Sequence, residues 1–155
     1  MDGNLRTLEE LAAHAGSFVK GLVPAGKGAT LVTLSGELGA GKTAFVKAAA
    51  RALGIAEDVT SPTFVLEKIY ALPVQSPATF PEKSGGGFAR LVHIDAYRLA
   101  SGAELAALGF DEIMQDAGNL VMLEWPERVA DSLPIPAARV KLAAHADGSR
   151  TISYG

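Results

Sequence analysis

The sequence predicts a single α/β domain, on three observations. Short apolar segments rich in β-branched residues alternate along the chain with segments of helix-forming residues. The length of 155 residues suits one domain, and 48% apolar residues suffice for its core. Near the C-terminus, Asp147, Gly148 and Ser149 separate two extended segments, which is typical of an antiparallel hairpin. No internal repeat is visible, so we expect residues 1–155 to form one domain.

The first half of the chain predicts two helices and two strands. Residues 7–23 have an amphipathic pattern and begin with a threonine and a glutamate at the spacing of a capping box, which predicts a helix. Residues 29–36 are an apolar, β-rich run that ends in glycine, which predicts a buried strand. Strong helix formers followed by glycine predict a helix over 42–54. Alternation over 63–72 predicts a strand with one solvated face.

The second half predicts more strands, joined by short helices. We expect strands at 89–99 and 119–125, the second of them buried, with one or two short helices between them at 101–114. A further helix is expected over 126–133, because its first residue is proline. The hairpin strands are expected at 137–146 and 149–155.

The segment 72–88 differs in composition from the rest of the chain. It contains three prolines and three consecutive glycines between two predicted strands. The glycines are followed by neither a lysine nor a helix, so a second phosphate cradle is not indicated. We expect an exposed, mobile inserted loop.

Charge and composition exclude several classes of function. The net charge is −3, and no cluster of Lys and Arg stands out, so this chain is not expected to bind nucleic acid stably by itself. Cysteine is absent, which excludes disulfides and thiolate metal sites and fits a reducing compartment. The N-terminus is polar, and no apolar run approaches the roughly 18 residues of a membrane span. We therefore expect a cytoplasmic protein with no membrane partner.

The clearest chemical motif is a phosphate-binding loop. Gly36, Gly41, Lys42 and Thr43 match the pattern G-x-x-x-x-G-K-[ST] between a predicted strand and a predicted helix. Glycines, including Gly39, allow backbone N–H groups to approach phosphates, and the helix N-terminus favours an anion. The lysine can reach the terminal phosphates, and the threonine hydroxyl can bind Mg²⁺.

A nucleotide-hydrolysing site of this kind also needs a carboxylate at the end of a strand. Asp95 and Glu124 each end an apolar run, and the pattern alone leaves open which of them faces the metal. Trp125, the only tryptophan, follows Glu124 directly and is either a site residue or core packing. His93 lies within a predicted strand, and we interpret it as a structural residue.

Two further features concern the nucleotide. Hydroxyl groups flank a proline at residues 59–64, which indicates either a switch-like turn that senses a phosphate or an ordinary turn entering a strand. The Asn-Lys-x-Asp segment that usually marks guanine binding is absent, which favours adenine.

Five segments together resemble one family. They are GELGAGKTAFVKAAARALG, VTSPTFVLEKIY, HIDAYRL, ELAALGFDEIM and LEWPERV followed by LP. In this order they resemble the bacterial TsaE family, the small ATPase of tRNA threonylcarbamoyladenosine biosynthesis. The resemblance covers most of residues 7–154, with 72–88 as an insertion.

The resemblance implies a fold and a set of site residues. The fold is a P-loop NTPase-like, three-layer arrangement with a largely parallel central sheet, and the cofactors are ATP and Mg²⁺. The implied catalytic residues are Lys42, Asp95, Glu124 and Trp125, and the implied metal ligands are Thr43 and Glu124. The implied nucleotide-binding residues are Thr7, Gly36, Glu37, Leu38, Gly39, Ala40, Gly41, Lys42, Thr43, Thr63 and Arg150. One departure is Ala44, where many members have a second threonine.

The resemblance also implies a role. Family members are accessory ATPases that act with the TsaB–TsaD complex, and tRNA is reached only through that complex. Two other hypotheses remain. A small-molecule kinase would usually need a basic lid, and Lys83, with Arg90 just beyond the segment 72–88, supplies few positive charges for one. A pure binding module would use the nucleotide only for assembly.

Overall fold

The computed structural model describes residues 3–62, 66–73 and 87–155. Its strands are β1 (Gly3–Leu5), β2 (Thr30–Ser35), β3 (Glu67–Ala71), β4 (Arg90–Asp95), β5 (Asn119–Glu124), β6 (Ala138–Ala144) and β7 (Arg150–Tyr154). They form one seven-stranded sheet in the order β1-β7-β6-β2-β5-β4-β3. The four central strands β6, β2, β5 and β4 are parallel neighbours, whereas the pairings at both edges are antiparallel. The expected mixed α/β sheet with a largely parallel centre is therefore present.

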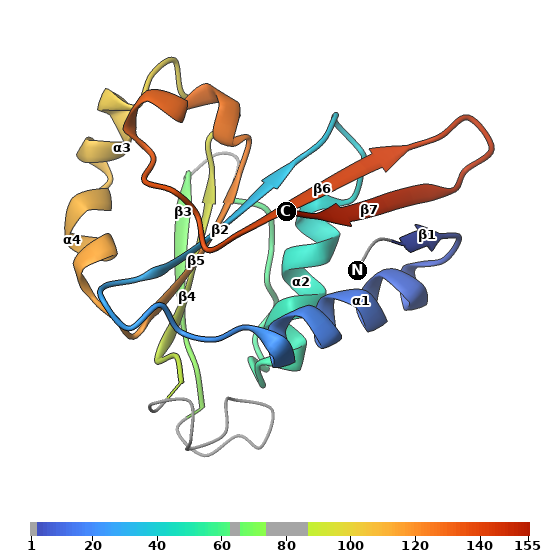
Figure 1. Ribbon diagram of the computed structural model, residues 1–155, viewed down its shortest axis with the longest axis horizontal. Coiled ribbons are helices and arrows are strands. Elements are labelled where there is room, and N and C mark those ends of the chain that lie inside the picture. The colour runs from blue at the N-terminus through green and yellow to red at the C-terminus, as the bar shows by residue number, and fades with distance from the viewer. Residues whose placement is uncertain (1–2, 63–65, 74–86) are drawn as a thin grey trace.

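Helices cover both faces of this sheet (Figure 1). The helices α1 (Leu8–Gly21) and α2 (Lys42–Ala52) pack against each other and against one face. The short helices α3 (Ala103–Ala107) and α4 (Phe110–Gln115) contribute to the core on the other face. The molecule thus has the three layers that the sequence resemblance implied.

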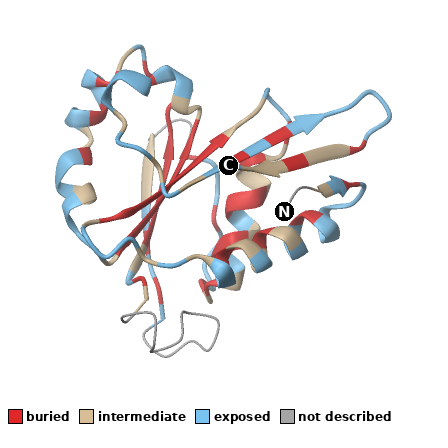
Figure 2. Ribbon diagram, viewed as in Figure 1, coloured by how far each residue is buried: buried red, intermediate tan, exposed pale blue. Residues whose placement is uncertain are grey.

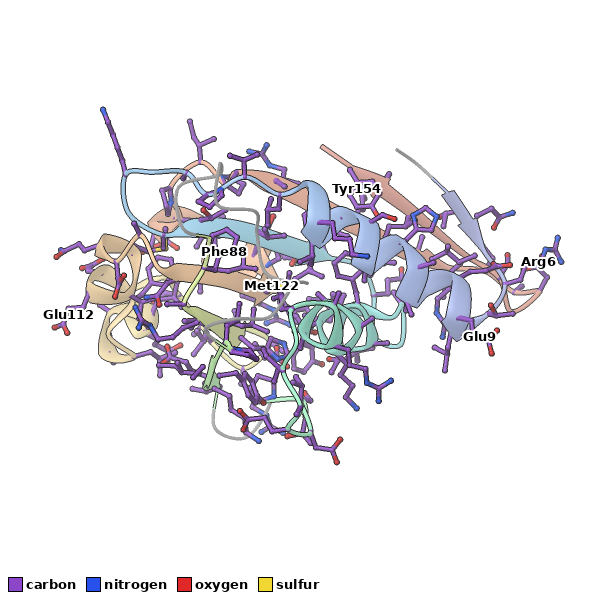
Figure 3. The ribbon with its side chains drawn as sticks, turned by 90° about the horizontal axis from the view of Figure 1, so that it is seen from below. Arg6, Glu9, Phe88, Glu112, Met122 and Tyr154 are labelled. Atoms are coloured by element: carbon purple, nitrogen blue, oxygen red, sulfur yellow. The ribbon has the colours of Figure 1, made fainter. Side chains whose placement is uncertain are left out.

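Two apolar cores lie on the two faces because side chains alternate along each strand. In β5, Leu120 and Met122 belong to the core beneath α1 and α2, whereas Val121 and Leu123 belong to the other core. All six residues of β5 are buried, which explains the unbroken apolar run Leu120 to Leu123 between Asn119 and Glu124. Figure 2 shows the buried residues concentrated in the central strands, and Figure 3 shows Met122 in the interior.

Most predicted elements are confirmed. Thr7 is the N-cap of α1 and accepts a hydrogen bond from the backbone N–H of Glu10 at 3.1 Å. The hairpin of β6 and β7 is present, with Gly148 at φ 87° in its turn. The strand expected at 63–72 is observed as β3, and residues 63–65 lie outside the described part of the chain.

The helix expected over 126–133 is wrong. This segment forms two single 3₁₀ turns, η2 (Pro126–Arg128) and η3 (Ala130–Ser132). The backbone of Val129 has φ −132°, which interrupts helical geometry between the two turns. The chain therefore turns at the end of β5 instead of leaving it along a helix.

Two other outcomes concern the edges of the sheet. No sequence pattern indicates β1, which pairs with β7 from Gly3 opposite Ile152 to Leu5 opposite Arg150. Residues 74–86 of the expected loop lie outside the described part, but Leu72 and Phe88 at its two ends are buried. The expectation of exposure over the whole of 72–88 is therefore wrong at those ends. Within the described residues, the helices are all too short or too polar to cross a membrane.

Candidate phosphate-binding site

The glycine-rich loop at residues 36–41 joins the end of β2 to the start of α2. Gly36, Gly39 and Gly41 have φ values of 144°, 80° and 111°, which L side chains rarely adopt. A Cβ atom at Gly36 would also lie 2.3 Å from the carbonyl oxygen of Leu142 in β6. The loop therefore needs glycine for its conformation and, at Gly36, for close packing against β6.

Lys42, the first residue of α2, folds back over this loop. Its Nζ donates hydrogen bonds to the carbonyl oxygens of Gly36 and, at 2.9 Å, of Glu37. The same atom lies 4.2 Å from the ring centroid of Trp125, which allows a cation–π interaction. Burial lowers the pKa of Lys42, and nearby carboxylates of Glu124 and other acids oppose that shift. The ammonium group is thus held inside the loop by carbonyl oxygens and by an aromatic face.

Thr43 and Glu124 come together from sequence positions 81 residues apart. The Thr43 hydroxyl donates to the Glu124 carboxylate, at 3.0 Å from Oε2 and 3.2 Å from Oε1. Glu124 ends β5 and is only 3% exposed. Because β2 and β5 are parallel neighbours, the start of α2 and the end of β5 lie at the same edge of the sheet. Of the two acids considered from the sequence, Glu124 is therefore the one beside the threonine.

Asp95 lies on the neighbouring strand, directly opposite Glu124 in the β4–β5 register. It is 4% exposed, and its Oδ1 accepts a hydrogen bond from the backbone N–H of Tyr97 at 3.0 Å. Two carboxylates thus end adjacent parallel strands, one beside Thr43 and the other beside the turn that follows β4.

Trp125 has a backbone conformation unusual for a residue with a large side chain. Its φ of 62° lies in the left-handed region, and its N–H donates to the carbonyl oxygen of Leu34 at 3.1 Å. Its ring packs on Tyr97, with 4.9 Å between centroids. The turn directs the chain away from β5 and sets the indole beside Lys42.

One cavity of about 340 Å³ collects most of the expected site residues. It is lined by Leu38, Gly39, Gly41, Lys42, Thr43, Ala44, Ser61, Asp95, Tyr97, Glu124 and Trp125. Ala44 stands where many members of the family have a second threonine, and Ser61 supports a site role for the turn at 59–64. Tyr97 is not among the expected site residues, although it belongs to the segment HIDAYRL and follows Asp95 by two positions.

The remaining expected residues have different places. Gly36 and Glu37 accept hydrogen bonds from Lys42, and Ala40, within the loop, is fully buried. Arg150 reaches the loop from β7 and donates to the carbonyl oxygen of Gly39 at 3.3 Å. Thr7 is the N-cap of α1 and is not among the cavity-lining residues. Thr63 lies outside the described residues.

His93 is a neighbour of the site that sequence reasoning treated as structural. It is fully buried in β4, and its Nε2 lies 2.6 Å from Oε2 of Glu124. The available signal was its position two residues before Asp95, which puts both side chains on the same face of the sheet.

Comparison with known proteins shows which family the chain resembles along its length. A family model described as threonylcarbamoyl adenosine biosynthesis protein TsaE matches residues 5–152. The chain is 40% identical over 124 residues to the tRNA threonylcarbamoyladenosine biosynthesis protein TsaE of Treponema pallidum, which covers 80% of each chain. It is 31% identical over 150 residues to the protein of the same name from Rickettsia prowazekii, across 96% of this chain and 90% of that one.

A solved structure is similar along almost the whole chain. The crystal structure of YdiB from Bacillus subtilis superposes with a TM-score of 0.72 at 27% identity, covering 99% of this chain and 83% of that chain. The match over nearly the full length, together with the relatives above 30% identity, shows that the chain belongs to the TsaE family.

Proposed function

We propose that this protein is a Mg²⁺-dependent ATPase that serves tRNA N6-threonylcarbamoyladenosine biosynthesis as an accessory to the TsaB–TsaD complex. The observation that carries the proposal is the convergence of Lys42, Thr43 and Glu124 in one cavity beside a glycine-rich loop. The pathway is taken from the names of the relatives. The proposal places the protein in the cytoplasm.

The loop has the properties that a triphosphate requires. Gly39 has no side chain and open space beside it, so an anion can approach the backbone there, and the loop runs into the N-terminus of the eleven-residue helix α2. Lys42 already points its ammonium group at the loop interior, where it donates to the Gly36 and Glu37 carbonyls. We propose that Lys42 exchanges these carbonyl oxygens for phosphate oxygens, which are stronger acceptors for a buried cation.

The donor set suits a hard divalent cation. Thr43 and Glu124 offer only oxygen atoms, and Mg²⁺ is usually held by one or two carboxylates together with substrate phosphates. Across the described residues, no group of three or more His, Asp or Glu side chains forms a cage that would hold a metal by itself. When bound with the nucleotide, Mg²⁺ neutralises charge on the phosphate oxygens.

For hydrolysis we assign Asp95 to the attacking water. Its carboxylate lines the cavity at the end of the strand adjacent to Glu124. Hydrogen bonding to the Tyr97 N–H fixes one of its oxygens, which helps to orient a water molecule or accept its proton. Phosphoryl transfer depends mainly on positioning and electrostatics, so a partner that completes the site accelerates it strongly. We therefore propose slow hydrolysis by the isolated chain and faster hydrolysis with TsaB–TsaD.

Steady-state ATP hydrolysis, measured with and without purified TsaB–TsaD, tests this function. Stimulation by the pair, abolished in Lys42→Ala, is the expected result. If TsaB–TsaD does not stimulate hydrolysis while Lys42→Ala still abolishes the basal rate, the proposed coupling to TsaB–TsaD is contradicted. The proposed ATPase activity would then still stand. Phosphorylation of a metabolite in a substrate screen would instead favour the kinase hypothesis.

A further inference from the structure

His93 stands in direct contact with the candidate metal ligand, although its strand position suggested a core residue. It is 0% exposed, and its register neighbours are Met122 on β5 and Lys68 on β3. Its Nε2 lies 2.6 Å from Oε2 of Glu124, a residue 31 positions later in the sequence. A fully buried imidazole therefore meets the site carboxylate at a short hydrogen-bond distance.

The surroundings of the ring define what it supplies. Nδ1 of His93 has no hydrogen-bond partner among the described residues. A carboxylate oxygen accepts hydrogen bonds, so the hydrogen between the two side chains is assigned to Nε2 of the imidazole. The polar contact of His93 with the described residues is thus one N–H donated to Glu124.

This donor acts together with Thr43 on a single carboxylate. Among the described residues, Oε2 of Glu124 accepts from His93 on β4 and from Thr43 on α2, whereas Oε1 has only the longer 3.2 Å contact with Thr43. Two donors on separate elements fix the orientation of the glutamate side chain before any ligand binds. Oε1 therefore accepts weaker hydrogen bonding than Oε2 does and keeps more of its lone-pair capacity to coordinate a cation.

We propose that His93 is a positioning residue that holds Glu124 in the orientation required to bind Mg²⁺. This inference rests on the proposed function, because it needs a Mg²⁺-nucleotide in the cavity. Hydrogen-bond partners of metal ligands typically contribute about 10- to 100-fold to metal affinity. His93 acts through Glu124 and does not itself touch the nucleotide or the metal.

A set of substitutions separates positioning from packing. In His93→Gln the amide nitrogen can occupy the place of Nε2 and donate to Glu124. His93→Asn is also polar but too short to place a donor there, and His93→Leu fills the volume without any donor. Leu91→Val is the matched packing control, since Leu91 is buried on the same strand and the same face, and its register partner on β5 is Leu120.

The readout is the fluorescence of Trp125, the only tryptophan, which lies beside Lys42 and follows Glu124. The full chain is titrated with the non-hydrolysable ATP analogue AMP-PNP, first in EDTA and then at increasing MgCl₂. Circular dichroism confirms that each variant is folded. This equilibrium measurement does not depend on turnover.

Added Mg²⁺ is expected to tighten the binding of AMP-PNP. In His93→Leu and His93→Asn, we expect the MgCl₂ concentration that gives half of this effect to rise about 10- to 100-fold. Binding in EDTA should change little, and His93→Gln and Leu91→Val should stay near the wild type. An unchanged Mg²⁺ requirement in His93→Asn, or an equal rise in Leu91→Val, would overturn the positioning role. If His93→Leu does not fold, the comparison of His93→Asn with His93→Gln is sufficient to test the positioning role. Wild-type protein that binds no AMP-PNP would refute the proposed function itself, and with it this inference.

Discussion

Lys42 and Asp95 line the same cavity but are expected to serve different steps. Lys42→Ala removes the ammonium group from the loop and should abolish ATP binding. Asp95→Ala leaves the loop, Lys42 and Thr43 intact, so ATP should still bind while hydrolysis falls by about 10²- to 10⁴-fold. Binding is measured by Trp125 fluorescence and hydrolysis by phosphate release.

Glu112→Ala is a suitable control, because Glu112 is an exposed acid on α4 outside the cavity (Figure 3). Undiminished ATP hydrolysis in Asp95→Ala would contradict a hydrolytic role of this residue. Normal assembly and normal tRNA modification in Asp95→Ala, with ATP hydrolysis lost, would favour the hypothesis of a pure binding module, in which the nucleotide serves only assembly.

Glu67, the first residue of β3, is expected to make the stability of the folded state depend on pH. Burial raises the pKa of its carboxyl group above the ordinary value of 4.5, and its Oε2 has no hydrogen-bond partner among the described residues. The folded state therefore holds this proton more tightly than the unfolded state does, and stability falls as pH rises from 4.5 through the folded-state pKa. Glu67→Gln should raise the unfolding temperature at pH 7 by a few degrees, with the gain shrinking toward pH 4.

Thermal unfolding monitored by circular dichroism at several pH values checks this behaviour. Glu112→Gln serves as the exposed control and should change the unfolding temperature little. A gain in Glu67→Gln that is equal at pH 4 and pH 7 would mean that lost charge is not the cause.

The phosphate loop, as an element, should be sensitive to two distinct kinds of strain. Alanine at Gly36 or at Gly39 must adopt a positive φ, which costs roughly 1–2 kcal/mol. At Gly39 the added Cβ meets no atom within 4 Å, whereas at Gly36 it would overlap the Leu142 carbonyl of β6. Gly36→Ala should therefore lower the free energy of unfolding by about 1–3 kcal/mol more than Gly39→Ala does. Urea denaturation measures this difference, and equal losses in the two variants would contradict the packing argument.

The boundaries of the helices show where local sequence patterns suffice to predict the structure and where they do not. The sequence predicts Thr7 at the start of α1, because a side-chain oxygen there can satisfy an unpaired N–H, and the structure has that hydrogen bond. The segment after β5 has a proline at a helix start, yet it forms only two 3₁₀ turns. Its conformation follows from Trp125, whose N–H is bonded to Leu34 of β2, a contact with a distant strand.

At the scale of the whole molecule, the two cores should unfold together. Strands β2, β4 and β5 supply side chains to both cores, so neither core can persist without the shared sheet. Far-UV circular dichroism and Trp125 fluorescence should therefore give one coincident transition. Separate transitions would show that the two faces are independent.

Nucleotide binding should shift that single transition as a unit. AMP-PNP with MgCl₂ at about 100 times its Kd is expected to stabilise the folded state by about 2.7 kcal/mol. Both probes should report the same shift, and Lys42→Ala should remove it. Stabilisation that persists in Lys42→Ala would place the nucleotide outside the phosphate loop.

The sequence by itself determined most of the helices and strands and the chemical motif of this protein. Apolar periodicity and end signals located α1, α2, β2, β4, β5 and the C-terminal hairpin, because these depend on residues close in the chain. The loop at 36–43 and the segments that resemble the TsaE family were visible for the same reason.

Only the tertiary structure decided which side chains meet. It placed Glu124 beside Thr43 and beside His93, and it paired β1 with β7. It also turned Lys42 back onto the carbonyls of its own loop. The contacts of Glu124 and the pairing of β1 with β7 depend on the order and register of strands that are far apart in the sequence. Local residue spacing therefore does not reveal them.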